Sequence, residues 1–270
     1  MIAARTTCVC VLCACSLYSC VCVCVCYLHQ AFLSVLWTLP GFKYTDISLD
    51  LMHIGDLGII QYLLGNVVLE CFWRMDGTYA NPKEAMADLT MLFKQASRML
   101  KITPPFAFLT LGMFKQRGKD PCLRLKAAES RRALACCALI LTEFLKPRND
   151  HEHLVANCVL SLHNVYERLK IWSDGSASQC ATEGRRFLML YAQLNREGDE
   201  RVAALKWTPY KFYPKFHLFV HLVEDQTKHV GNPRKFWCYG DEDAIGKGCE
   251  IAASGHCKYV HRACIDKYRL

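Results

Sequence analysis

Acidic and histidine side chains lie close together in the segment SLDLMHIGDLGIIQYLLGNVV, residues 48–68, where a polar stretch leads into an apolar run. Asp50 and His53 are three residues apart, and Asp56 follows three residues later. A carboxylate with a histidine beside it can bind a divalent metal ion and orient a further ligand. The plainer interpretation is the start of a helix, where Asp50 accepts hydrogen bonds from backbone N–H groups.

A second polar segment, PKFHLFVHL, contains Lys215, His217 and His221. The two histidines are four residues apart, so a helix would place them on one face. That spacing can hold zinc in HExxH motifs, but the intervening residues here are Leu, Phe and Val. The missing glutamate argues against a metalloprotease site. The plainer interpretation is two histidines on a partly buried helix.

The motif GDEDAIG supplies three neighbouring acids, Asp241, Glu242 and Asp243. Acids beside glycine usually form solvated turns, but their oxygen atoms also suit Mg²⁺. A looser group of candidate zinc ligands follows in Cys249, His256, Cys257, His261 and Cys264. Their spacing lacks the close cysteine pair of most structural zinc sites, so thiols in a helix core are the plainer interpretation.

A block of helices is predicted between the two polar segments, from about residue 82 to residue 206. Apolar residues recur there at intervals of three and four, with no repeat period. The predicted helices span residues 81–102 (with Asn81 as the cap and Pro82 first), 121–146 (one helix or two), 150–172 and 181–198. The apolar run before them fits either a buried helix or a strand leading into a helix. This order suggests a site built from distant parts of the chain.

Two segments together resemble a known family. PGFKYTDISLDLMHIGDLGIIQYLLG resembles the D-x-M-H…LG segment of CACTA-type DDE transposases and their decayed relatives. PKFHLFVHLVED…GNPRKFWCYGDEDAIG resembles the later segment of the same proteins, in which K-x-H-x-x-x-H precedes an acidic residue. The segments occur in the family's order with helices between them, and the resemblance covers residues 39–270.

The resemblance implies an RNase H-like α/β core interrupted by a large helical insertion. Residues 40–81 would be the first remnant of the catalytic core, residues 82–206 the insertion and residues 207–270 the second remnant. The family cleaves and joins DNA strands with two divalent ions, Mg²⁺ or Mn²⁺, held by three acids. Asp50 would be the second acid and a metal ligand, and Glu242 the third.

The remaining matched residues would have lesser roles. Asp241 or Asp243 would be substitute metal ligands in place of Glu242. His53, His217 and His221 would support catalysis or position DNA.

The first catalytic acid of the family has no counterpart here, since no Asp or Glu precedes Asp46. A two-ion site without it loses a bridging ligand. We therefore expect a predominantly α-helical chain with an incomplete RNase H-like core. It would be a nuclear, transposase-related remnant that lacks catalytic activity but keeps residual binding of DNA and divalent metal ions. The residues indicate no particular oligomeric state.

Residues 1–39 form an apolar, low-complexity segment with eight of the chain's 18 cysteines in its first 26 residues. A signal peptide and a membrane span within residues 8–39 are two interpretations. We favour a third, translation of a TG dinucleotide repeat, which encodes alternating Cys and Val. The alternative function is a membrane-anchored helical protein in the membrane or secretory pathway, held by residues 8–39.

Composition does not distinguish between these alternatives. The chain has 270 residues, 52% of them apolar, which is enough for a large core. Its net charge of +8 allows a polyanionic partner without specifying one. The ten later cysteines lie mostly in apolar helical patterns, so we expect reduced, buried thiols and no disulfide framework.

Overall fold

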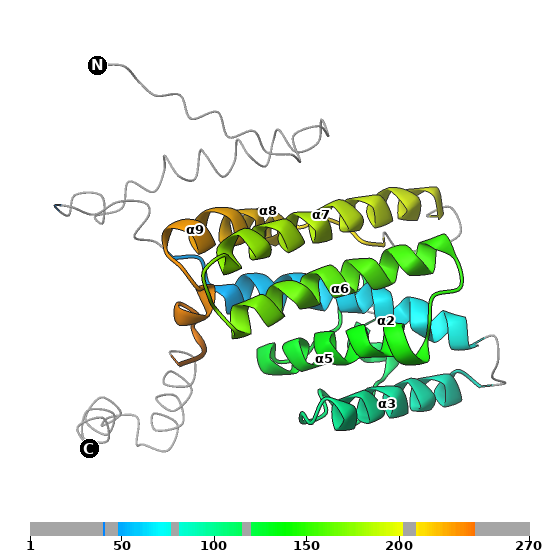
Figure 1. The fold of residues 1–270 in the computed structure, drawn as a ribbon. Helices are drawn as coiled ribbons and strands as arrows, with labels where there is room; N and C mark the ends of the chain where they lie inside the picture. Colours follow the sequence, from blue (N-terminus) through cyan, green and yellow to red (C-terminus); the bar gives the residue numbers. More distant parts are fainter. Residues whose placement is uncertain (1–39, 41–47, 77–80, 115–119, 202–208, 241–270) are drawn as a thin grey trace, which may run out of the picture. The chain divides into compact units, whose positions relative to one another are not determined.

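The computed structural model describes residue 40 and residues 48–76, 81–114, 120–201 and 209–240. All the described helices belong to one compact unit, Ser48–Leu270. Every described element is a helix, and no strand occurs among these residues (Figure 1). The predicted predominance of α-helix is therefore confirmed. An RNase H-like sheet is not seen in this part of the chain.

The helices follow one another with short connections. The π-helical segment η4 (Met52–Ile59) continues into α2 (Ile60–Asp76), and π-helical η5 (Ile140–Phe144) extends α5 (Ala127–Leu139). The other elements are α3 (Pro82–Met99), α4 (Leu111–Phe114), α6 (Asp150–Lys170), α7 (Ser176–Arg201), α8 (Pro214–His221), η6 (Leu222–Gln226), α9 (Thr227–His229) and η7 (Pro233–Lys235).

The four helices predicted for the middle of the chain are present as α3, α5 with η5, α6 and α7. Asn81 caps α3 as predicted, because its side chain accepts a hydrogen bond of 2.9 Å from the backbone N–H of Lys83. Asn149 caps α6 in the same way, through the N–H of Glu152. The polar residues at these starts thus set the boundaries that the periodicity alone leaves approximate.

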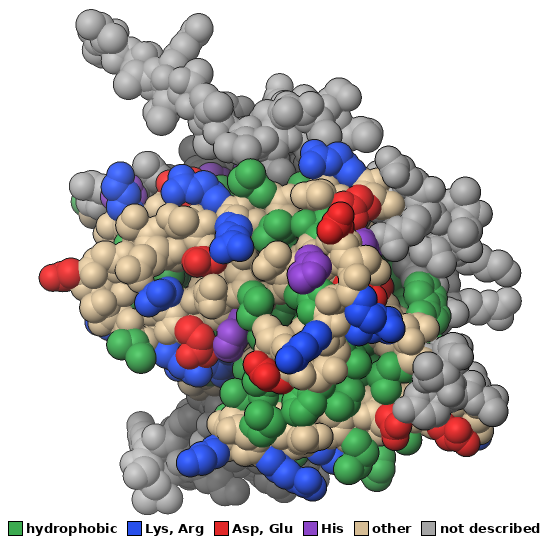
Figure 2. All heavy atoms as spheres, turned by 45° about the vertical axis from the view of Figure 1, so that its right-hand side comes forward, with side chains coloured by type: hydrophobic (Ala, Val, Ile, Leu, Met, Phe, Trp, Pro, Cys, Tyr) green, Lys and Arg blue, Asp and Glu red, His purple; other side chains and the backbone are tan. Residues whose placement is uncertain are grey.

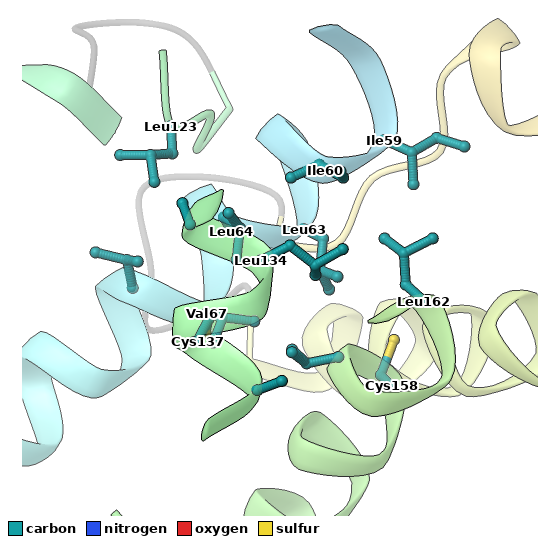
Figure 3. Close-up of a cluster of buried hydrophobic side chains, with 14 of the residues drawn as sticks. Ile59, Ile60, Leu63, Leu64, Val67, Leu123, Leu134, Cys137, Cys158 and Leu162 are labelled. Atoms are coloured by element: carbon teal, nitrogen blue, oxygen red, sulfur yellow. The ribbon is translucent and has the colours of Figure 1, made fainter. Parts of the chain in front are cut away.

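The apolar run after Asp56 is a helix, which resolves the choice between helix and strand. Leu63, Leu64 and Val67 of α2 are fully buried and pack with residues of α5 and α6 (Figure 3). A helix surrounded on several sides needs no polar face, so its apolar residues show no clean period. The stretch Met52–Met75 is also long and apolar enough to cross a membrane. Its most apolar window is 78% buried inside the protein, as expected of a core helix.

The remaining core is built on α6 and α7, which lie side by side (Figure 1). Phe187 and Tyr191 of α7 contact Phe216 of α8, with ring centroids 6.3 and 4.5 Å away. The cysteines of α2, α5, α6 and α7 are buried and behave as small apolar residues, as predicted: they are Cys71, Cys136, Cys137, Cys158 and Cys180.

Side-chain hydrogen bonds connect residues 49–57 with residues 215–226 near the other end of the described chain. The Gln226 amide accepts a hydrogen bond from the Leu49 N–H (2.6 Å) and donates one to the Leu49 carbonyl (3.1 Å). Lys215 of α8 donates to the carbonyl of Leu57 in η4 (3.1 Å). The two segments that carry the candidate residues therefore lie against each other, although about 160 residues of chain separate them.

Candidate functional site

Asp50 lies where the two segments meet. Its Oδ1 accepts hydrogen bonds from the backbone N–H groups of Met52 and Cys238, both at 3.1 Å. Its Oδ2 accepts from the N–H of His53 at 3.2 Å and also contacts Nδ1 of that ring. Burial alone would raise the pKa of Asp50, but the hydrogen bonds from His53, Cys238 and Met52 outweigh it and lower that pKa. Asp50 is thus a helix cap, and it also binds the C-terminal segment.

Cys238 joins Asp50 and His53 in a compact group of potential metal ligands. One ligand atom from each residue lies within 4.8 Å of the other two. Among the described residues no other group of three or more Asp, Glu, His or Cys side chains comes this close. Sequence reasoning did not single out Cys238. It has no ligand partner at a recognisable spacing, and only the fold brings it to Asp50.

Asp56 is fully buried and makes three polar contacts from three different parts of the chain. Tyr166 of α6 donates a hydrogen bond to Oδ1 (2.7 Å), and Tyr239 donates one to Oδ2 (2.6 Å). The guanidinium Nε of Arg131 in α5 lies 3.2 Å from Oδ2 as an ion pair. Burial raises the pKa of Asp56 to about 6, against the opposing effects of Tyr239, Arg131 and Tyr166. This carboxylate therefore ties helices together and does not face solvent.

Arg131 also anchors the segment that contains Cys238. Its guanidinium carbon lies 4.7 Å from the ring centroid of Trp237 and 4.8 Å from that of Tyr239. The guanidinium of Arg234 lies over the Trp237 ring as well, at 4.8 Å. Cation–π contacts of this kind are worth roughly 0.5–2 kcal/mol each. Both neighbours of Cys238 are therefore fixed to the helical core, and the position of Cys238 is fixed with them.

His217 and His221 share one face of α8, as their spacing predicts. Their Nε2 atoms are 3.2 Å apart, and Nδ1 of His221 lies 2.7 Å from Oδ2 of Asp225. Burial, followed by the neighbouring His221, lowers the pKa of His217. His217, His221 and Asp225 form a separate series of side-chain contacts and are not part of the ligand group around Asp50.

Several predicted residues lie outside the described part of the chain. They are Asp241, Glu242 and Asp243, the later Cys and His residues from Cys249 to Cys264, and the apolar residues 8–39. Their proposed roles remain predictions.

A pocket of about 600 Å³ opens elsewhere in the same unit, between α2, α6 and Tyr210. In its wall, Nε2 of His151 lies 2.9 Å from Oε2 of Glu70. Nδ1 of the same ring lies 2.9 Å from Oε2 of Glu197. Arg74 is held by Glu152 at 3.0 Å and by two backbone carbonyls. These contacts join α2, α6 and α7 across their polar edges.

Replacing His151 with leucine should lower the free energy of unfolding by about 1 kcal/mol, because two carboxylates lose a shared partner at a partly exposed position. Chemical denaturation followed by circular dichroism measures the change. His153→Leu is the matched control, since His153 is exposed on the same helix. Equal effects of the two substitutions would show that the carboxylate bridge adds nothing to stability.

Comparison of the chain with known protein families, with curated proteins and with solved structures finds no match.

Proposed function

We propose that this chain is a transposase-related protein that binds DNA without cleaving it, with a nuclear location. The observation that supports it best is the meeting of the two motif segments. The N–H of Cys238 binds Asp50, and the hydroxyl of Tyr239 binds Asp56. A transposase needs these segments side by side, since each supplies acids to the same catalytic site.

The surroundings of Asp50 and Asp56 support the expected lack of cleavage. A two-ion mechanism needs carboxylates that are free to share metal ions. Asp56 is buried and held by two tyrosines and an arginine. The one ligand group among the described residues contains a single carboxylate with an imidazole and a thiol. Mg²⁺ and Mn²⁺ prefer oxygen ligands, so this donor set does not fit them.

DNA binding is supported by the segment that follows η6. From Thr227 to Gly240 it contains Lys228, Arg234 and Lys235 and no acidic residue. Lys228 and Lys235 are exposed, and so is Phe236, with 40% of its surface accessible. Basic side chains attract the phosphate backbone, and exposed aromatic rings can stack on unpaired bases.

The face drawn in Figure 2 offers no competing basic patch. It is the view of Figure 1 turned by 45° so that the right-hand side comes forward, and Lys, Arg, Asp and Glu side chains are interspersed on it. A mixed surface of this kind has no single-sign field to attract a polyanion.

The test is fluorescence anisotropy of a short labelled duplex with the full chain at several salt concentrations. Replacing Lys228, Arg234 and Lys235 together with glutamine should weaken binding about 10-fold or more and reduce the salt slope by about 2–3. The matched control, Lys83→Gln with Arg98→Gln and Lys101→Gln, removes the same charge from exposed positions on or beside α3.

Two results would contradict the proposal. Equal losses in the two triple variants would mean that overall charge, and not this segment, attracts DNA. Metal-dependent strand cleavage that disappears in Asp50→Asn would show that the protein is a competent nuclease after all.

A further inference from the structure

We propose that Asp50, His53 and Cys238 form a binding site for one Zn²⁺ ion or a similar transition-metal ion. The site fixes the C-terminal segment to the start of η4. This inference stands independently of DNA binding, because it rests only on the three side chains and their surroundings. It also differs from the two-ion magnesium site that the family resemblance implies.

The distances suit a metal ion of this class. Ligand atoms around tetrahedral Zn²⁺ lie about 3.3–3.8 Å apart, given bonds of about 2.0–2.3 Å. The ligand atoms of the three residues already lie within 4.8 Å of one another. Nδ1 of His53 contacts Oδ2 of Asp50 directly, so a bound ion would replace this hydrogen bond, and the half-exposed His53 ring has solvent on one side.

The donor types select the metal. A thiolate and an imidazole are ligands of Zn²⁺, Co²⁺ and similar ions, whereas Mg²⁺ takes oxygen ligands almost exclusively. The single carboxylate of Asp50 completes a mixed set of sulfur, nitrogen and oxygen. Three protein ligands leave room for a fourth, such as water, in a tetrahedral arrangement.

The site is preorganised by contacts that do not involve the metal. The N–H of Cys238 donates to Oδ1 of Asp50, which leaves Oδ2 on the side of His53. Trp237 and Tyr239, on either side of Cys238, pack against Arg131. The charge of Arg131 is balanced by Asp56, so it opposes a bound cation only weakly.

Cys238 also differs from the buried core cysteines of the described chain. Cys71, Cys136, Cys137, Cys158 and Cys180 are buried in the apolar core and belong to no group of potential metal ligands among the described residues. Cys238 is only half-buried and lies beside a carboxylate and an imidazole. Removing it should therefore have a distinct effect on metal binding.

The experiment titrates the reduced full-length chain with Co²⁺ and follows the thiolate-to-metal absorption band, with bound zinc counted by mass spectrometry. Wild type should bind one more equivalent than either Cys238→Ser or His53→Gln, and each variant should weaken this site at least about 100-fold. The double variant should lose no further equivalent. Cys122→Ser, at another half-buried thiol, is the control and should match wild type.

Three outcomes would overturn the proposal. Wild type and both variants could bind the same number of ions, which would place all metal elsewhere among the chain's 18 cysteines. Excess Mg²⁺ could displace Co²⁺ from the site. Binding could depend on Cys238 but not on His53. Because His53 is half-exposed, His53→Gln should keep the helical circular dichroism of wild type, so loss of metal in that variant would report the site and not unfolding.

Discussion

Replacing Arg131 with methionine is expected to lower the free energy of unfolding by about 3–5 kcal/mol at pH values near 8. The Asp56 carboxylate is fully buried, and the guanidinium of Arg131 lies 3.2 Å from its Oδ2. Without this cation, the charge keeps only the hydroxyl groups of Tyr166 and Tyr239. A buried charge that loses its counter-ion costs far more than an exposed pair would. Methionine keeps much of the side-chain volume, so the loss reports mainly the charge.

The same substitution should lower the free energy of unfolding much less at about pH 5. The direction of this pH dependence follows from the pKa of Asp56. Its pKa is raised from 3.8 to about 6 in the folded protein. The stability that this group contributes is therefore present below 3.8 and is lost as pH rises through 6. Near pH 5 Asp56 is neutral in the folded protein, so the loss of its counter-ion Arg131 matters little. The difference between the two pH values should reach about 2–3 kcal/mol, since one pKa unit corresponds to 1.36 kcal/mol.

Denaturant unfolding followed by circular dichroism at both pH values measures this effect. Arg132→Met is the matched control, because it removes the same charge at the next position and has no ion pair with Asp56; a loss below about 1 kcal/mol is expected. A loss for Arg131→Met that is the same at both pH values would mean that packing against Trp237 and Tyr239, and not the charge of Asp56, explains it.

The helices of the middle block were predictable because each has one face in the core and one in water. Apolar residues therefore recur at intervals of three and four, and Asn81 marks the beginning of α3. The run that forms η4 and α2 gave no such signal. Its residues are buried on several sides, so the choice between helix and strand depended on packing partners far away in the sequence.

The candidate site was predictable only in its local part. Asp50 caps the start of η4 within three residues of itself, a relation that spacing reveals. The partners of Asp56 come from α5, α6 and the C-terminal segment, and Cys238 reaches Asp50 from 188 residues away. No local pattern encodes such pairings, because they depend on how the helices pack.

Replacing Gly65 with alanine is expected to lower the free energy of unfolding by about 3 kcal/mol or more, since overpacking usually costs 1–3 kcal/mol even where side chains can move aside. A Cβ at this position of α2 would lie 2.5 Å from the Cys122 nitrogen, 2.6 Å from the Cys122 Cα and 2.7 Å from the Pro121 carbonyl carbon. These are backbone atoms, which cannot rotate away.

Residues 121–125, which face Gly65, are hydrogen-bonded to α2, so they cannot move away from an added methyl group. The N–H of Leu123 donates to the carbonyl of Gln61 (2.8 Å), and the Gln61 side chain donates to the carbonyl of Leu125 (2.6 Å). Gly112→Ala is the control, because its nearest neighbour would be 4.0 Å away; it should be neutral or stabilising by up to about 1 kcal/mol. Similar denaturation midpoints for the two alanine variants would contradict this close approach of α2 to residues 121–125. This close approach places the start of α5, and hence Arg131, beside Asp56. A variant that loses the close approach should therefore also weaken the group of Asp50, His53 and Cys238 that Arg131 supports.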